Sequence, residues 1–178
     1  MKNFKFIAKV GLSLFVICTI VALLLAVVNG LTKDKIAENN NLKMQETIAS
    51  IFGEGIELQD TDVEIKDSVN AVYTVTKDGT EIGYAVYVTP QGFKAPIEMM
   101  VGINPDGSVM DVKIISLSET PGLGSKVEEN DFIGQYKGGL GEFTVKGNIT
   151  PVAGATISST AVTTGVNDAM NAVGGLNG

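Results

Sequence analysis

The chain has 178 residues with 13 basic and 20 acidic side chains, no His and no Trp, and every basic residue is Lys. This length allows one domain of ordinary size. Without His or Arg, the chain can form neither a Ser-His-Asp or Cys-His catalytic site nor a guanidinium clamp for phosphate. Its one cysteine, Cys18, cannot form an intrachain disulfide and cannot by itself hold a Cys-ligated zinc or an iron–sulfur cluster.

The amino terminus is long and apolar enough to form a membrane anchor. No side chain is charged across residues 10–32, and a helix of that length spans roughly 34 Å at about 1.5 Å per residue. Lys2, Lys5 and Lys9 precede this run, which under the positive-inside rule keeps the amino terminus in the cytoplasm. The alternatives are a buried core helix and a cleaved signal peptide, whose apolar core is typically about 7 to 15 residues long. We expect residues 1–32 to be a cytoplasmic amino terminus and a single-pass transmembrane helix.

The part of the chain after the anchor is acidic, with 10 Lys against 20 acidic residues. This balance argues against nucleic acid and anionic lipid as partners. It fits a basic patch on a neighbouring subunit, and it fits equally well a surface that is acidic only for solubility.

Residues 33–53 are predicted to form a juxtamembrane stalk helix, which could continue the membrane helix. Ile36, Met44, Ile48 and Ile51 recur at intervals that place them near one helix face. Gly53 would end this helix.

Residues 54–178 are predicted to form one α+β domain with a largely antiparallel sheet and flanking helices. Apolar residues alternate along four runs joined by turn signals such as Asp78-Gly79, which predicts a meander. The four runs are residues 71–75, 83–88, 96–103 and 109–117. A short helix near residues 127–133, a brief strand at residues 143–145 and a helix ending near residue 173, capped by Ser158 and Ser159, complete the predicted domain.

Two polar, glycine-bearing loops, at residues 119–124 and 152–160, each join a strand-like run to a helix-like run. In the second loop, Gly154 and Ala155 leave space beside the Thr156 hydroxyl, and the helix terminus that follows favours an anion. Physical reasoning therefore predicts a phosphate near Thr156, held by backbone N–H groups and hydroxyls. An ordinary helix cap explains the same residues, and the glycine spacing fits neither a Walker nor a dinucleotide motif.

Residues 154–162, Gly-Ala-Thr-Ile-Ser-Ser-Thr-Ala-Val, resemble the flavinylation motif of the covalent FMN-binding domain family. In that family FMN is esterified through its phosphate to the threonine after Gly-Ala. Residues 119–124, Glu-Thr-Pro-Gly-Leu-Gly, are similar to the family's loop against the flavin ring, and residues 92–103 resemble the strand leading into it. The resemblance implies that Thr156 is the covalent FMN acceptor, and that the other FMN-binding residues are Glu119, Thr120, Gly122, Leu123, Gly154, Ala155, Ser158 and Ser159.

Within this family, an anchor followed by one short domain resembles the G subunits of Rnf-type ion-translocating ferredoxin:NAD oxidoreductase complexes. The C subunits of sodium-translocating NADH:quinone reductases share both parts but are usually longer. The resemblance implies a membrane-anchored subunit with an extracytoplasmic FMN domain, loaded by a flavin transferase, that relays electrons among other membrane subunits. It implies an enzyme only as a redox subunit, because no residue cluster predicts a catalytic site, a metal site or a nicotinamide site.

Two rival functions fit the same sequence. One is a non-catalytic, membrane-tethered binding module in which the Thr156 loop is only a helix cap. The other is a stand-alone extracytoplasmic flavoprotein reductase. Visible flavin absorbance that survives denaturation would exclude the first, and co-purification with polytopic subunits would exclude the second.

Overall fold

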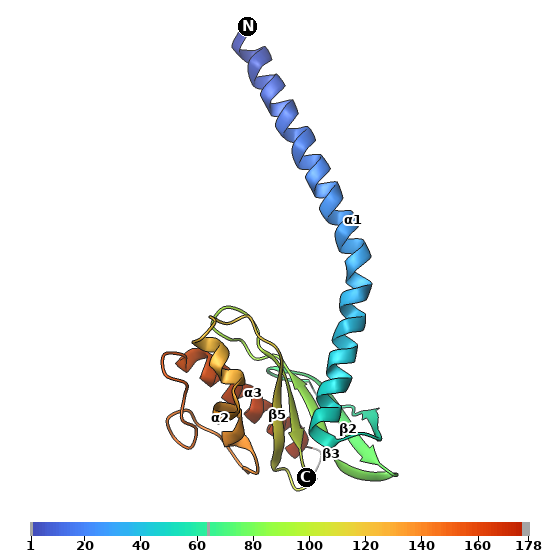
Figure 1. The fold of residues 1–178 in the computed structure, drawn as a ribbon, viewed down its shortest axis with the longest axis vertical. Coiled ribbons are helices and arrows are strands. Elements are labelled where there is room, and N and C mark those ends of the chain that lie inside the picture. The colour runs from blue at the N-terminus through green and yellow to red at the C-terminus, as the bar shows by residue number, and fades with distance from the viewer. Residues whose placement is uncertain (1, 64, 176–178) are drawn as a thin grey trace. The chain divides into compact units, whose positions relative to one another are not determined.

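The computed structural model describes residues 2–63 and 65–175. Among residues 2–41, side chains are described for residues 9–33 and for residue 35. The described chain divides into two compact units, residues 1–42 and 43–178. The first helix, α1 (Lys2–Phe52), continues without interruption across this boundary (Figure 1). Anchor and stalk are therefore one helix. The prediction that Ile36 lies on the apolar face of this helix concerns a side chain outside the described ones.

The apolar stretch of α1 is Lys9–Lys33, which is 25 residues long and is exposed along its whole length. Exposed apolar side chains are costly in water, because about 25 cal/mol is lost for each Å² of apolar surface left unburied. A helix of this length and composition can cross a bilayer, where lipid would cover these side chains.

The second unit is built on a five-stranded antiparallel sheet in the order β1-β2-β3-β4-β5. The strands are β1 (Ile56–Asp60), β2 (Val69–Lys77), β3 (Thr80–Val88), β4 (Glu98–Ile103) and β5 (Val109–Ser116). The predicted hairpin is present. Lys77 pairs with Thr80, and the two turn residues between this pair, Asp78 and Gly79, each have a positive φ. The α+β class and the meander are confirmed, while β1 is an additional, largely exposed edge strand.

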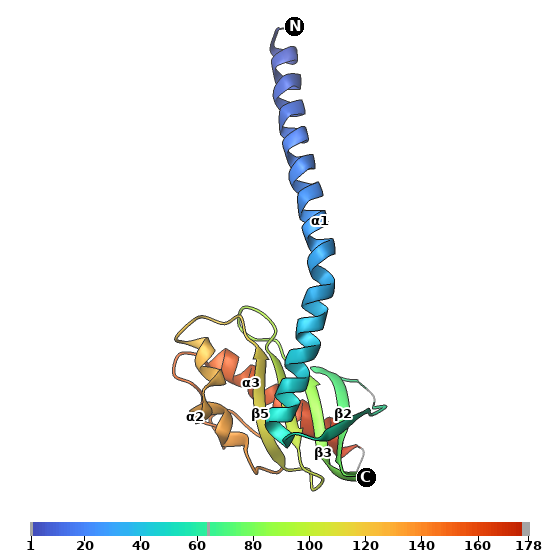
Figure 2. The same ribbon diagram turned by 45° about the vertical axis from the view of Figure 1, so that its right-hand side comes forward.

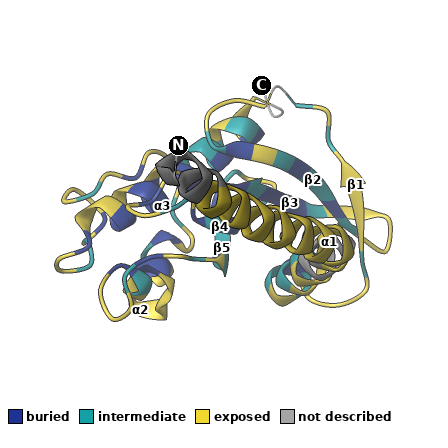
Figure 3. Cartoon of the chain, turned by 90° about the horizontal axis from the view of Figure 1, so that it is seen from above, coloured by how far each residue is buried: buried dark blue, intermediate teal, exposed yellow. Residues whose placement is uncertain are grey.

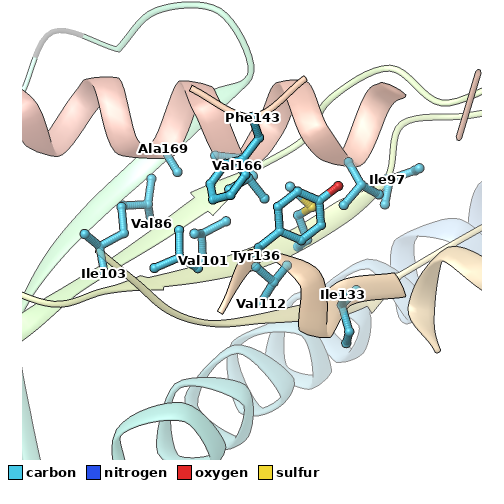
Figure 4. Close-up of a cluster of buried hydrophobic side chains, with 14 of the residues drawn as sticks. Val86, Ile97, Val101, Ile103, Val112, Ile133, Tyr136, Phe143, Val166 and Ala169 are labelled. Carbon is cyan, nitrogen blue, oxygen red and sulfur yellow. The ribbon is translucent and has the colours of Figure 1, made fainter. Parts of the chain in front are cut away.

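Helix α3 (Thr156–Gly174) covers one face of the sheet and contacts β2, β3 and β4 (Figure 2). Its buried residues Val162, Val166 and Ala169 belong to the main core. Figure 4 shows Val166 and Ala169 on the side of α3 that faces residues of the sheet such as Val86 and Val101. The main core therefore lies between α3 and the sheet.

The last turns of α1 pack on the opposite sheet face. Ile48 and Phe52 are buried there against residues of the sheet that include Ala85 and Met100, with Met44 and Ile51 partly buried beside them. The strands are mostly buried or half-buried in Figure 3, whereas the apolar stretch of α1 is exposed. The predicted helix face through Met44, Ile48 and Ile51 is confirmed.

Between β5 and α3 the chain forms short turns of helix: η1 (Gly124–Glu128), α2 (Asn130–Ile133) and η2 (Gly134–Tyr136). The single helix predicted near residues 127–133 is thus divided between η1 and α2. Within this segment burial raises the pKa of Tyr136 to about 12, while its hydrogen bond to Thr163 acts in the opposite direction.

The prediction of a strand at residues 143–145 is wrong. Only an isolated bridge forms there, between Val145 and Ile149. The side chain of Asn167 accepts from the Phe143 N–H at 2.9 Å and donates to the Phe143 carbonyl at 2.8 Å. Because α3 satisfies both backbone groups of Phe143, this residue needs no partner strand.

Candidate functional site

Thr156 is the first residue of α3 and its side chain is exposed. Gly154, with φ of +77°, turns the chain into the helix, and Ala155 precedes the first turn without a side-chain cap. A non-glycine residue disfavours such a φ, so the glycine fits this turn. The first N–H groups of an α-helix have no acceptor within the helix and carry partial positive charge. The Thr156 hydroxyl therefore lies at a helix end that favours an anion.

Ser158 and Ser159 do not cap α3, contrary to the prediction. Both lie inside the first turn and are buried. Ser159 Oγ donates to the Ala155 carbonyl at 2.9 Å and accepts from the Val152 N–H at 3.0 Å. The serine thereby fixes the chain that enters the helix, and the helix start remains open towards Thr156.

Glu119 connects three segments of the site. Its side chain is only 7% exposed. Oε2 accepts from Ser158 Oγ at 2.9 Å, and Oε1 accepts from the Lys94 N–H at 3.1 Å. One carboxylate thus joins the first turn of α3 to the loop before β4. Hydrogen bonds to a charged group are among the stronger ones in proteins.

Two glycines allow these segments to approach the Glu119 carboxylate. A Cβ at Gly92 would lie 2.5 Å from Glu119 Oε1, and a Cβ at Gly124 would lie 2.8 Å from Oε2 and 3.0 Å from Ser158 Oγ. Atoms do not approach this closely without displacement, so side chains at these two positions would separate the loops. No sequence pattern predicts this role for either glycine, because the close approach arises only in the folded chain.

The three segments enclose a hollow of about 320 Å³. Most of the residues that the sequence analysis singled out line it, namely Glu119, Thr120, Leu123, Gly154, Ala155, Thr156 and Ser158. Gly122, with φ of +72°, forms the turn beside the hollow, and Ser159 is buried outside its lining.

Three apolar side chains around this hollow are exposed: Phe93 (62%), Leu123 (42%) and Ile157 (55%). Phe93 and Ile157 were not among the predicted site residues. The only signal for Phe93 is a lone aromatic residue in the stretch that resembles the family's strand, and the signal for Ile157 is its place directly after Thr156.

These residues fit FMN. A planar apolar ring system matches a hollow bordered by Phe93, Leu123 and Ile157. A phosphate matches the Thr156 hydroxyl and the adjoining helix start. Gly154 keeps the entrance open, since a Cβ there would lie 2.9 Å from Leu123 Cδ1.

An apolar amino-terminal helix followed by this sheet and site defines the class of membrane-anchored proteins with an FMN-binding domain. The model of the FMN-binding domain family matches residues 92–171, and the model of the RnfG N-terminal region matches residues 1–51. A solved structure, that of the C subunit of the Na(+)-translocating NADH-quinone reductase from Parabacteroides distasonis, has the same fold. It has a TM-score of 0.56 at 18% identity and covers 82% of this chain and 94% of that one.

Relatives specify the family more closely. The G subunit of the Na(+)-translocating ferredoxin:NAD(+) oxidoreductase complex of Acetobacterium woodii is 33% identical and covers 93% of this chain and 90% of that protein. The G subunit of the ion-translocating oxidoreductase complex of Haemophilus influenzae is 31% identical, with coverages of 91% and 87%. A G subunit from Clostridium ljungdahlii is 39% identical over a shorter match, which spans 57% of this chain and 58% of that protein. The chain belongs to the family of G subunits of Rnf-type ion-translocating oxidoreductase complexes.

Proposed function

We propose that the chain carries FMN in a phosphoester bond to Thr156 and relays electrons within an Rnf-type ferredoxin:NAD oxidoreductase complex. The observation that carries this proposal is the position of the exposed Thr156 hydroxyl, at the open start of α3 and at the edge of a hollow with an apolar border. The bound flavin supplies the redox chemistry. The residues of the chain hold it and set its surroundings.

Esterification leaves the phosphate with about one negative charge. The amino-terminal end of α3 stabilises such a charge by typically ~0.3 to 1 kcal/mol. That contribution alone would not retain a cofactor, whereas a covalent bond makes dissociation irrelevant. Permanent attachment suits a carrier on the outer membrane face, where a lost flavin is not readily replaced.

The loop at residues 119–124 holds the ring in this proposal. Leu123 contributes part of the apolar wall, and Thr120 offers a hydroxyl at the hollow. Glu119 acts through Ser158 and the Lys94 N–H, since both of its oxygens already accept hydrogen bonds there. Gly122 gives the loop its turn.

The direct test is the intact mass of the protein co-expressed with a flavin transferase, followed by peptide mapping. We expect an added mass of one FMN less one water on Thr156. Thr156→Ala should abolish the adduct with the fold unchanged, and Thr156→Ser should retain it because a hydroxyl remains. Thr144→Ala, at another exposed threonine, is the matched control. An unmodified wild-type chain, or FMN on another residue, would refute the proposal.

The membrane orientation belongs to the same proposal. Lys9 and the two lysines before it should hold the amino terminus in the cytoplasm, which places residues 54–178 outside. A reporter that is active only outside the cytoplasm should be active when fused after residue 175 and inactive when fused before residue 2. The reverse pattern would refute the orientation.

The partners in this proposal are the membrane subunits of the complex. The relatives' names describe subunits of such assemblies, and the acidic exterior would suit a basic neighbouring surface. Co-purification of the flavin-loaded chain with polytopic subunits would support this role. Recovery of the chain alone, still able to reduce a soluble acceptor, would favour a stand-alone reductase.

A further inference from the structure

Glu119 is the only charged residue among the described residues that line the hollow of the candidate site. The rest of the lining consists of apolar residues, glycines, a serine and threonines. Lys94 and Lys126 belong to segments around the hollow, but their side chains are exposed, so water screens their charges. A ring system in this hollow is therefore lined by one formal charge from the protein, and that charge is negative.

The hydrogen bonds of Glu119 match the ionised form of its side chain. Oε1 accepts from the Lys94 N–H and Oε2 accepts from Ser158 Oγ, and an ionised carboxylate only accepts hydrogen bonds. Both donors are neutral groups. They hold the carboxylate in place and favour its charge, but they do not cancel it as a paired cation would.

The Glu119 carboxylate is also shielded from water. The residue is only 7% exposed, and the backbone at Gly92 and Gly124 packs directly on its two oxygens. Its remaining open side belongs to the lining of the hollow, where a bound ring would cover it. Coulomb interactions are much stronger where water is excluded, and dissolved ions screen them less. The charge of Glu119 should therefore act strongly on a ring in the hollow.

The positive end of α3 does not offset this charge in the proposed function. The phosphate attached at Thr156 lies at that end and brings about one negative charge of its own. Phosphate and helix end then largely balance each other. The carboxylate of Glu119 remains as the uncompensated charge beside the ring.

We propose that Glu119 lowers the reduction potential of the flavin by holding a fixed negative charge beside its ring. This inference rests on the proposed function. Reduction adds two electrons from a reductant, and one or two protons from water, to the flavin. With one proton, the ring gains a full negative charge, and the carboxylate repels it. The oxidised ring is neutral and is not repelled, so the charge opposes reduction.

A lowered potential suits the proposed place of this chain in an electron-transfer complex. Reduced ferredoxins are strong reductants. An electron that passed from such a donor to a flavin of high potential would lose most of its free energy in that one step. A negative charge beside the ring reduces this loss, and it does so without any further cofactor.

The test is a spectroscopic redox titration of the full-length, FMN-loaded chain with dithionite and reference dyes. Glu119→Gln keeps the size of the side chain and can serve both hydrogen-bond partners, but it removes the charge. We expect an equilibrium constant for two-electron reduction that is about tenfold larger, which is a midpoint potential about 30 mV higher. The difference should persist in about 1 M salt, because the carboxylate is buried.

Two further variants separate the charge of Glu119 from its geometry. Glu119→Asp keeps the charge but is too short to reach both partners as before, and its potential should stay closer to the wild-type value than that of Glu119→Gln. Glu128→Gln removes an exposed charge from η1 and is the matched control, which should leave the potential unchanged. Circular dichroism should show that all variants are folded.

An unchanged potential in Glu119→Gln would overturn this inference and leave the proposed function intact. Equal shifts in Glu119→Asp and Glu119→Gln would also overturn it, because altered geometry would then be the cause. The same holds if Glu119→Gln acquires no FMN while the wild type does, since the residue would then serve attachment. A wild-type chain without FMN on Thr156 would instead refute the proposed function.

Discussion

Glu119 organises the candidate site more than any other residue. It is separated by 39 residues from Ser158 and by 25 from Lys94, and it binds both. Two loops and the first turn of α3 therefore meet at one buried carboxylate. Leaving such a group or its partners unpaired costs more than the net gain from forming the bond, because desolvation is then uncompensated.

Glu119→Ala should lower the free energy of unfolding by about 3 kcal/mol, because it leaves the Ser158 hydroxyl and the Lys94 N–H without their partner and opens a small void. Glu119→Gln should cost only about 1 kcal/mol, since the amide can accept from the Lys94 N–H and donate to Ser158 Oγ. Urea unfolding of residues 43–178 measures both. Glu128→Gln, at an exposed glutamate, should change little, and equal losses for Ala and Gln at residue 119 would contradict the role as a connector.

At the scale of elements, the contact between α1 and the sheet depends on small residues in the strands. A Cβ at Gly102 would lie 2.5 Å from Ile51 Cγ2, and a Cβ at Gly83 would lie 3.1 Å from Phe52 Cε1. The helix end therefore packs directly on the backbone of β3 and β4. A glycine in a strand often marks such a close approach.

Gly102→Ala should destabilise the domain by about 1 to 3 kcal/mol, because the new methyl group overpacks the contact with Ile51. Gly134→Ala is the matched control, since nothing lies within 4 Å of a Cβ there and its φ of −62° suits any residue. The double variant with Ile51→Ala should recover part of the loss in a double-mutant cycle of urea unfolding. Additive losses would contradict direct contact.

At the scale of the whole molecule, the boundary between the two compact units falls inside α1, whereas the predicted domain boundary follows the end of that helix. The FMN domain is predicted to span residues 54–178, whereas the second compact unit of the structure begins at residue 43. The difference is residues 43–53, which are the last ten residues of α1 and Gly53, and they include Ile48 and Phe52 of the smaller core. That boundary remains a prediction, and truncation can test it.

Residues 43–178 should form a water-soluble, folded protein, since the apolar stretch Lys9–Lys33 is absent. Residues 54–178 should be less stable by about 3 to 6 kcal/mol, because burying each of the large side chains Ile48 and Phe52 contributes about 1.5 to 3 kcal/mol. Thermal unfolding and size-exclusion chromatography compare the two. Equal melting temperatures would show that the end of α1 is dispensable for the domain.

The sequence by itself determined the features that depend on local pattern. An uncharged run at residues 10–32 defines the apolar helix, alternation and the Asp78-Gly79 turn define the meander, and the Gly-Ala-Thr motif locates Thr156. Each of these signals lies within a short window, so the neighbours along the chain are sufficient to identify it.

Only the tertiary structure decided which distant residues meet. Ser158 points towards Glu119 instead of capping α3, and Phe93 reaches the same hollow from the loop before β4. The Phe143 backbone binds Asn167 instead of a strand. From the sequence alone, a hydroxyl, an amide or an aromatic ring could contact many different partners equally well. Packing of α3 and the loops on the sheet selects one of them, because only that arrangement buries the core and leaves the buried polar groups paired.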